Sequence, residues 1–283
     1  QIGTSEELFG FANIINSSLY NIVPFCAELT QDIVLNKNLQ ANGKGLIEWI
    51  PIRNFDGTFD GQGHTISGLY FNDTTVTNAG LFASISNQDA LSPTVVKNLN
   101  IADAYIRAGL NSGALVGEIS ELSKNVVIEN CEVEAIVGNP YIYQATQYRG
   151  GLVGLLHGGT LTIKHTSSIV DLFGSGVAGG LVGEVMGTLN IANTYSVVSD
   201  PSYLQCNGLV GSTPDPYYSG ITLVSAQINV ENSYGLAKST NGSQLTFVQL
   251  MRVPITVTYK NVFVYDEYNS FKDVVGLISV TDD

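Results

Sequence analysis

One short apolar phrase, bracketed by glycine, returns five times along the chain. It reads NAGLFAS at 78–84, SGALVGE at 112–118, RGGLVGL at 149–155, VAGGLVGE at 177–184 and CNGLVGS at 206–212. The leucines of successive phrases lie 34, 37, 29 and 28 residues apart. A nucleotide-binding loop needs one such phrase, whereas a period of roughly 20–50 residues indicates a solenoid or another stacked repeat.

A second motif follows each phrase after a variable loop. It reads VKNLNI at 96–101, IENCEV at 128–133, IKHTSS at 163–168, IANTYS at 191–196 and VENSYG at 230–235. Apolar residues in both motifs alternate with period two and many are β-branched, which predicts strands. One unit is too small to bury its apolar face, but stacked units pair from coil to coil, about 4.8 Å apart. We therefore expect an all-β fold, a right-handed parallel β-helix.

The central polar residue of the second motif is asparagine in four units and His165 in the other. Asparagine tolerates left-handed backbone geometry and can hydrogen-bond to its equivalents above and below. The column therefore predicts an asparagine ladder along one corner of the solenoid, with a structural role for His165.

The two ends of the chain differ from the middle. In TSEELFGFANII at 4–15, Thr4 stands three residues before Glu7, the spacing of a capping box, and apolar residues follow at helical intervals. We expect a short helix that caps the first coil. The whole chain, 1–283, is then one domain, with an N-terminal cap and first strands at 1–48, repeat coils at 49–240 and a C-terminal coil or cap at 241–283.

The segments LTQDIVL at 29–35 and WIPIRNFDGTFDGQGHTISGLYFN at 49–72 resemble the opening module of bacterial surface proteins with GLUG-type repeats. The match covers most of residues 4–265, and FDGTFDGQGHTISGL is its specific part. The resemblance implies a parallel β-helix on, or secreted from, cells that colonise hosts or surfaces; related repeats flank protease domains in some IgA-protease-like proteins. It brings no agreed catalytic residues, so none is transferred.

Composition narrows the class of partner. Lys and Arg number 12 against 25 Asp and Glu, a formal net charge of −13, which argues against nucleic acid and anionic membranes. No apolar run is long enough to span a bilayer. The sequence starts without a signal peptide, which suits a cytosolic protein or a mature secreted one; the resemblance favours an extracellular or cell-surface location.

No cofactor, metal or catalytic residue is expected. The three cysteines lack metal-ligand spacing and are expected to be buried free thiols. Asp56 to Gly61 imitates a calcium loop but has Ser67 where a bidentate Glu is needed. His64 is expected to be structural, and the glutamates look scattered, so the chain is not expected to be an enzyme. A carboxylate pair within about 5–10 Å on one external face would revive the alternative, a polysaccharide lyase or hydrolase.

Tyrosines in loops before the glycine phrases are the candidate binding residues: Tyr105, Tyr141, Tyr143, Tyr148 and Tyr203. A row of such rings on one side could bind a neutral glycan or a protein on a host or cell surface. The competing interpretation is ordinary loop packing. For the chain as a whole, the sequence predicts an adhesin-like binding module; the alternative is a structural subunit that stacks by strand pairing at uncovered solenoid ends.

Overall fold

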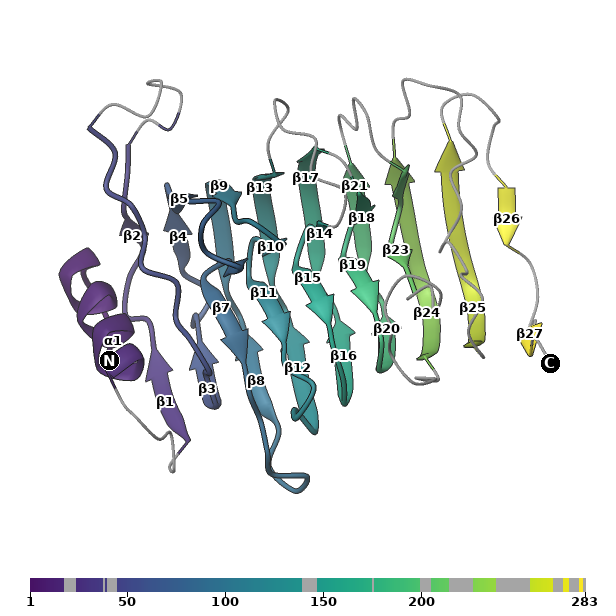
Figure 1. The fold of residues 1–283 in the computed structure, drawn as a ribbon, viewed down its shortest axis with the longest axis horizontal. Helices are drawn as coiled ribbons and strands as arrows, with labels where there is room; N and C mark the ends of the chain where they lie inside the picture. Colours follow the sequence, from purple (N-terminus) through teal and green to yellow (C-terminus); the bar gives the residue numbers. More distant parts are fainter. Residues whose placement is uncertain are drawn as a thin grey trace.

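A computed structural model describes residues 1–17, 24–37, 39, 45–138, 147–174, 176–198, 205–213, 226–237, 255–266, 272–274 and 280–281. Figure 1 shows successive coils side by side along the longest axis, with the helix α1 (Ser5–Ser17) at the N-terminal end. The prediction of a parallel β-helix with a short N-terminal helix is confirmed. Among the described residues, no helix has the length and apolar character needed to cross a bilayer.

The strands of the described residues form three sheets, one of 17 strands and two of five. The large sheet comprises β1 (Phe25–Glu28), β2 (Ile33–Val34), β3 (Gly57–Asp60), β4 (Thr65–Ser67), β5 (Tyr70–Asn72), β8 (Thr94–Lys97), β9 (Asn100–Arg107), β12 (Asn125–Glu129), β13 (Glu132–Gly138), β16 (Thr160–Lys164), β17 (Ser167–Phe173), β20 (Thr188–Ala192), β21 (Tyr195–Val198), β24 (Ala226–Ala237), β25 (Ile255–Asp266), β26 (Lys272–Val274) and β27 (Val280–Thr281).

The two smaller sheets are built from the glycine phrases. The β10 sheet contains β6 (Asn78–Ala79), β10 (Asn111–Gly113), β14 (Tyr148–Gly150), β18 (Val177–Gly179) and β22 (Gln205–Asn207). The β11 sheet contains β7 (Phe82–Ile85), β11 (Val116–Ile119), β15 (Val153–Leu156), β19 (Val182–Val185) and β23 (Val210–Ser212). Strands pair in parallel with their equivalents one coil away, as β12 does with β16 and β16 with β20. Each phrase therefore supplies two short strands at a bend of its coil.

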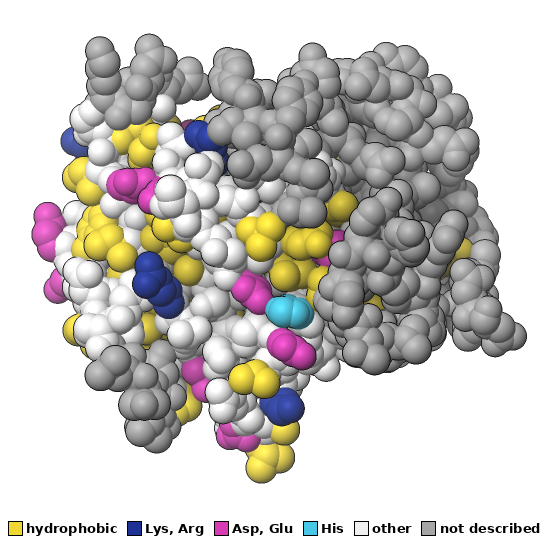
Figure 2. Space-filling model, in the orientation of Figure 1, with side chains coloured by type: hydrophobic (Ala, Val, Ile, Leu, Met, Phe, Trp, Pro, Cys, Tyr) yellow, Lys and Arg dark blue, Asp and Glu magenta, His cyan; other side chains and the backbone are white. Residues whose placement is uncertain are grey.

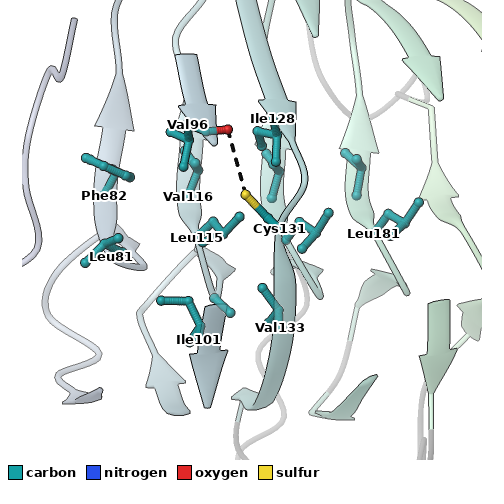
Figure 3. Close-up of a cluster of buried hydrophobic side chains, with 14 of the residues drawn as sticks. Leu81, Phe82, Val96, Ile101, Leu115, Val116, Ile128, Cys131, Val133 and Leu181 are labelled. Atoms are coloured by element: carbon teal, nitrogen blue, oxygen red, sulfur yellow. Dashed lines mark hydrogen bonds between the residues drawn. The ribbon is translucent and has the colours of Figure 1, made fainter. Parts of the chain in front are cut away.

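The leucines of the five phrases form an interior column. Leu81, Leu115, Leu152, Leu181 and Leu209 are all fully buried. The Leu152 amide donates to the Leu181 carbonyl at 3.0 Å, and the Leu181 amide donates to the Leu209 carbonyl at 2.8 Å. Figure 3 shows Leu81, Leu115 and Leu181 in the core beside Cys131, whose thiol contacts the Val96 carbonyl at 3.8 Å. The apolar interior is thus continuous from coil to coil.

The last glycine of the second to fifth phrases lets the two small sheets approach closely; the first phrase has Ala83 at this position. A Cβ at Gly117 would lie 2.7 Å from the Ala79 amide nitrogen, and one at Gly183 would lie 2.7 Å from the Arg149 amide nitrogen, both in the β10 sheet. Real Cβ contacts are longer, so any side chain here would push the sheets apart. The recurrence of glycine therefore follows from backbone proximity within the solenoid and requires no bound phosphate.

The predicted asparagine column lies at an exterior corner. Asn98, Asn130, His165, Asn193 and Asn232 have φ values of 51°, 52°, 50°, 51° and 47°, the left-handed region. The Asn130 side-chain amide donates to Asn98 Oδ1 at 3.2 Å, and Asn193 Nδ2 lies 3.2 Å from His165 Nε2. His165 therefore occupies a position in the column and has the structural role predicted for it.

The two ends of the large sheet differ. At the N-terminal end the predicted capping box is present: the Glu7 amide donates to Thr4 Oγ1 and the Thr4 amide to the Glu7 carboxylate, both at 3.2 Å. Leu8, Ala12 and Ile15 of α1 are buried, so the helix covers this end. At the other end β26 and β27 pair antiparallel with parts of β25, the last parallel strand, and become the edge of the sheet in its place.

The expectation of three buried thiols is wrong for Cys26, which is exposed because its side chain points outward from β1. Cys131 and Cys206 are buried, and burial raises the pKa of each thiol to about 12. These two cysteines therefore pack as small apolar residues.

Candidate functional site

The predicted tyrosines do not form one row. Tyr141, Tyr143 and Tyr203 lie outside the described residues. Tyr105 lies in β9 of the large sheet, where its ring stacks on Tyr70 with centroids 5.7 Å apart. Tyr148 lies in β14 of the β10 sheet, and its register neighbours are Asn111 and Val177.

The expected equivalence of Tyr105 and Tyr148 is therefore wrong. Tyr105 belongs to the strand that follows the Asn98 corner, and its neighbour in the next coil is Ile136. The sequence places both tyrosines shortly before a glycine phrase, but loops of different length separate strand from phrase in the two coils. Counting residues along the chain therefore does not show which strand each ring belongs to.

A polar network fills the angle between the two small sheets. Ser212 Oγ donates to Glu184 Oε2 at 3.1 Å, and the Tyr148 side chain lies near enough to this carboxyl group to influence its pKa. Further toward the N-terminus, His157 Nδ1 lies 2.9 Å from Glu118 Oε1, and the Asn78 side-chain amide donates to Glu118 Oε2. Neither glutamate could be linked to its partners from the sequence alone.

Burial controls the chemistry of Glu184. The side chain is almost fully buried, and its Oε1 atom has no hydrogen-bond partner. Burial raises the pKa of this carboxyl group from 4.5 to about 7, against the lowering effects of the Ser212 hydrogen bond and the Tyr148 side chain. For Tyr148, burial and the neighbouring Glu184 raise the phenol pKa to about 12. A large fraction of Glu184 is therefore protonated at neutral pH.

The same network contains a carboxylate pair of the kind that would revive the hydrolase alternative. Glu118, Leu155 and Glu184 share one column of the β11 sheet, which places the two glutamates two coils apart. At about 4.8 Å per coil, that spacing is near the upper end for an inverting glycosidase, about 6.5–9.5 Å. However, Glu184 is buried, Leu155 lies between them, and both Glu118 oxygens are hydrogen-bonded. This arrangement favours a structural role for the pair.

Asp56, Asp60 and His64 of the opening segment also form polar contacts within the fold. Asp56 accepts from Asn87 Nδ2 at 3.1 Å and Asp60 accepts from Asn98 Nδ2 at 3.0 Å. His64 Nδ1 lies 3.3 Å from Asp32 Oδ1. Within the described ranges no group of three or more His, Cys, Asp or Glu side chains could hold a metal ion.

Sequence reasoning missed an exposed apolar surface on the large sheet. Two neighbouring rows run across its C-terminal coils, and we call them together the outer stripe. The aromatic row pairs Tyr195 with Tyr234 and Tyr234 with Phe263, and the aliphatic row pairs Ile169 with Val197 and Val197 with Leu236. Because alternate residues of a strand face opposite sides, the intervening Ser196 and Val198 point inward and are buried.

The outer stripe is open to solvent. Tyr234, Phe263 and Ile169 retain 47%, 42% and 45% of their exposed area. The Tyr195 and Tyr234 rings stack with centroids 5.0 Å apart and planes 5° apart. Scattered exposed apolar residues need no explanation, but a contiguous set on one face indicates an interaction surface.

A sequence signal for the aromatic row exists. Tyr195, Tyr234 and Phe263 each stand two residues after an asparagine with left-handed φ, namely Asn193, Asn232 and Asn261. At the same position, earlier coils carry Asn100, Glu132 and Ser167. The corner asparagine sets the side-chain alternation of the strand that follows, and this position is exposed at Glu132, Tyr234 and Phe263, although Ser167 is buried. The chemistry of that row therefore changes from polar to aromatic along the axis.

Charge is sparse on the surface. On the face that Figure 2 shows, the coloured basic side chains stand singly among uncharged atoms and not in a cluster. Phosphate recognition needs clustered Lys and Arg. The part of the chain drawn in colour thus offers no phosphate-binding patch on this face.

The fold defines the chain as a parallel β-solenoid, and comparisons with known proteins agree. It resembles the crystal structure of a candidate immunoglobulin A1 protease from Bacteroides ovatus, with a TM-score of 0.51 and 16% identity over 100% of this chain and 79% of that one. At that identity the likeness concerns the fold alone. No protein-family model matches the sequence.

Two curated proteins share segments of sequence with the chain. Halomucin from Haloquadratum walsbyi is 28% identical over 159 residues, 56% of this chain but 2% of halomucin. A candidate Gly-rich membrane protein from Evansella cellulosilytica is 33% identical over 111 residues, 38% of this chain and 12% of that protein. The chain thus matches only a small part of each of these longer proteins.

Proposed function

We propose that this chain is a non-enzymatic binding module of an extracellular or cell-surface protein, and that the outer stripe is its contact surface. The observation that carries the proposal is the exposure of Ile169, Tyr234 and Phe263 in adjoining rows of one sheet. Stable folding gains nothing from leaving such side chains in water, since burying each one contributes about 1.5–3 kcal/mol.

The surroundings of the stripe support a binding role. The β-solenoid beneath it is rigid by virtue of its continuous core, so the rows are held at fixed spacing. Tyrosine and phenylalanine supply large contact areas at low cost in side-chain entropy, which suits them to interfaces. Similarity to small segments of two long proteins, one of them named a membrane protein, fits a module within a larger surface protein.

The two alternative functions have less support. The sequence linked assembly into filaments to uncovered solenoid ends, whereas α1 covers the N-terminal end and parallel pairing at the other end is interrupted by the short antiparallel strands β26 and β27. Hydrolysis needs a carboxyl pair that a substrate can reach, whereas Glu184 is buried and Glu118 is engaged by Asn78 and His157. Incubation with neutral or acidic polysaccharides is expected to release no reducing or unsaturated ends.

The binding proposal is tested with a paired set of variants. Tyr234→Ser/Phe263→Ser removes two rings of the outer stripe, and Leu91→Ser/Leu122→Ser removes side chains that are 92% and 62% exposed elsewhere. Both variants and the parent chain are applied to surfaces coated with mucin, collagen or neutral polysaccharide. We expect retention on at least one surface that falls about tenfold only in the stripe variant. Equal retention of all three proteins on every surface would contradict the proposal.

A further inference from the structure

The outer stripe has a repeat set by the solenoid itself. Its rows follow the coil spacing of about 4.8 Å, and the Tyr195 and Tyr234 ring centroids lie 5.0 Å apart along that direction. Because these rings stack face to face within 5°, their faces cover one another and their edges and hydroxyls face solvent. The stripe therefore presents the same kind of contact once per coil.

The two rows offer different chemistry side by side. The aromatic row carries the phenol hydroxyls of Tyr195 and Tyr234, and burial together with the neighbouring Tyr195 raises the pKa of Tyr234. The Tyr234 hydroxyl thus stays protonated as a hydrogen-bond donor at neutral pH. The aliphatic row, Ile169, Val197 and Leu236, carries no polar side-chain group. A partner that lies along the axis therefore needs apolar groups on one side and hydroxyl groups on the other.

The charges around the stripe are acidic. In the coils before it, Glu132 continues the aromatic row and Glu134 the aliphatic row, and both are exposed. At the corner beside Tyr234, Glu231 is paired with Lys260 at 3.4 Å. The whole chain carries a net charge of −13. An anionic polymer or a second copy of this chain would meet electrostatic repulsion here, whereas a neutral partner would not.

We infer that the outer stripe binds an extended, uncharged polysaccharide that lies along the solenoid axis. One pyranose unit of an extended glycan is close in length to one coil, so successive sugars meet successive coils in the same way. Each sugar has apolar C–H faces for the aliphatic row and hydroxyl groups for the tyrosine row. The inference rests on the proposed function, since it names the ligand class of the same surface.

The test compares three polysaccharides that differ in charge and shape. Microcrystalline cellulose is neutral and extended, amylose is neutral and coiled, and polygalacturonate is extended and acidic. We expect the chain to adsorb to cellulose, with amylose and polygalacturonate bound at least about tenfold more weakly. Adsorption to cellulose is expected to persist in high salt, because no ion pair contributes.

Variants connect that binding to the stripe. Tyr234→Ser/Phe263→Ser is expected to lower cellulose binding about tenfold, while Leu91→Ser/Leu122→Ser leaves it unchanged. If the first variant does not fold, Ile169→Asn, at a side chain 45% exposed in the other row, serves in its place. Circular dichroism and melting temperature confirm that each variant is folded.

Two results would overturn the inference in different ways. If the chain binds a protein-coated surface through the stripe but does not bind cellulose, the ligand is not a polysaccharide, and the proposed binding function still holds. If amylose binds as well as cellulose, the proposed match between sugar repeat and coil spacing is wrong. If polygalacturonate binds as well as cellulose, the proposed preference for an uncharged chain is wrong. If no binding of any kind depends on the stripe, the proposed function fails together with the inference.

Discussion

The Ser212 hydroxyl donates a hydrogen bond to Oε2 of the buried Glu184 carboxyl group at 3.1 Å. The bond links two successive coils, since Glu184 lies in β19 and Ser212 in β23. The other carboxyl oxygen, Oε1, has no hydrogen-bond partner. The angle between the β10 and β11 sheets therefore contains a group whose protonation affects stability.

Stability is predicted to fall as pH rises through this titration. The pKa of Glu184 is raised from 4.5 to about 7, so the folded protein keeps a proton that the unfolded chain releases. Stability from this group is present at low pH, declines between about 4.5 and 7, and is level above that range.

The variant Glu184→Gln is expected to remove about 2–3 kcal/mol of the difference in unfolding free energy between pH 5 and pH 8. Urea denaturation of both proteins at the two pH values measures it, and other titrating groups cancel in the comparison. Identical pH dependence in the variant would show that Glu184 titrates as it does in the unfolded chain.

Glycine at the sheet contact is predicted to be indispensable. In Gly183→Ala the new Cβ would lie 2.7 Å from the Arg149 amide nitrogen of the β10 sheet and 2.4 Å from the Gly154 carbonyl oxygen of its own sheet, so backbone on both sides prevents relief. We expect a loss of about 2–4 kcal/mol in unfolding free energy. Gly10→Ala is the matched control, because nothing lies within 4 Å of its Cβ and it stands inside α1. That change should stabilise the protein by about 0.5–1 kcal/mol; similar effects at both sites would contradict the close approach of the sheets.

The corner column gives a prediction with two substitutions at one site. Asn193 has a φ of 51° and its side chain lies 3.2 Å from His165 Nε2. Asn193→Ala loses the contact and strains the backbone, so we expect a cost of about 1–2 kcal/mol. Asn193→Gly loses only the contact and should cost clearly less. Thermal unfolding ranks the three proteins, and a glycine variant less stable than the alanine variant would be inconsistent with left-handed geometry at the corner.

The interior and corners of the solenoid could be predicted from the sequence because each is a repeated local requirement. The leucine column needs an apolar residue in every coil, and the asparagine column needs a left-handed residue at every corner. The capping box of Thr4 and Glu7 is likewise a local pattern. None of these features depends on the length of the loops between strands.

Sites that join different coils could not be predicted, because they depend on register. A bulge between Val133 and Ala135 shifts the pairing of β13 with β9, so the position of Tyr105 does not follow from counting. Glu118 and Glu184 share a column although they lie 66 positions apart in the sequence. The outer stripe does not follow from the repeat for a different reason: the strand position two residues after the corner residue is polar in the earlier coils, at Asn100, Glu132 and Ser167, and aromatic only in the later ones.

The central claim is that the chain works through the exposed outer stripe and not through the glutamate network. Cellulose adsorption of two double variants tests it directly: Tyr234→Ser/Phe263→Ser in the stripe, and Glu118→Gln/Glu184→Gln in the network. The account predicts that the first variant loses about tenfold in affinity, while the second stays within about twofold of the parent chain. Loss of binding in the glutamine variant, with full binding in the stripe variant, would contradict the account.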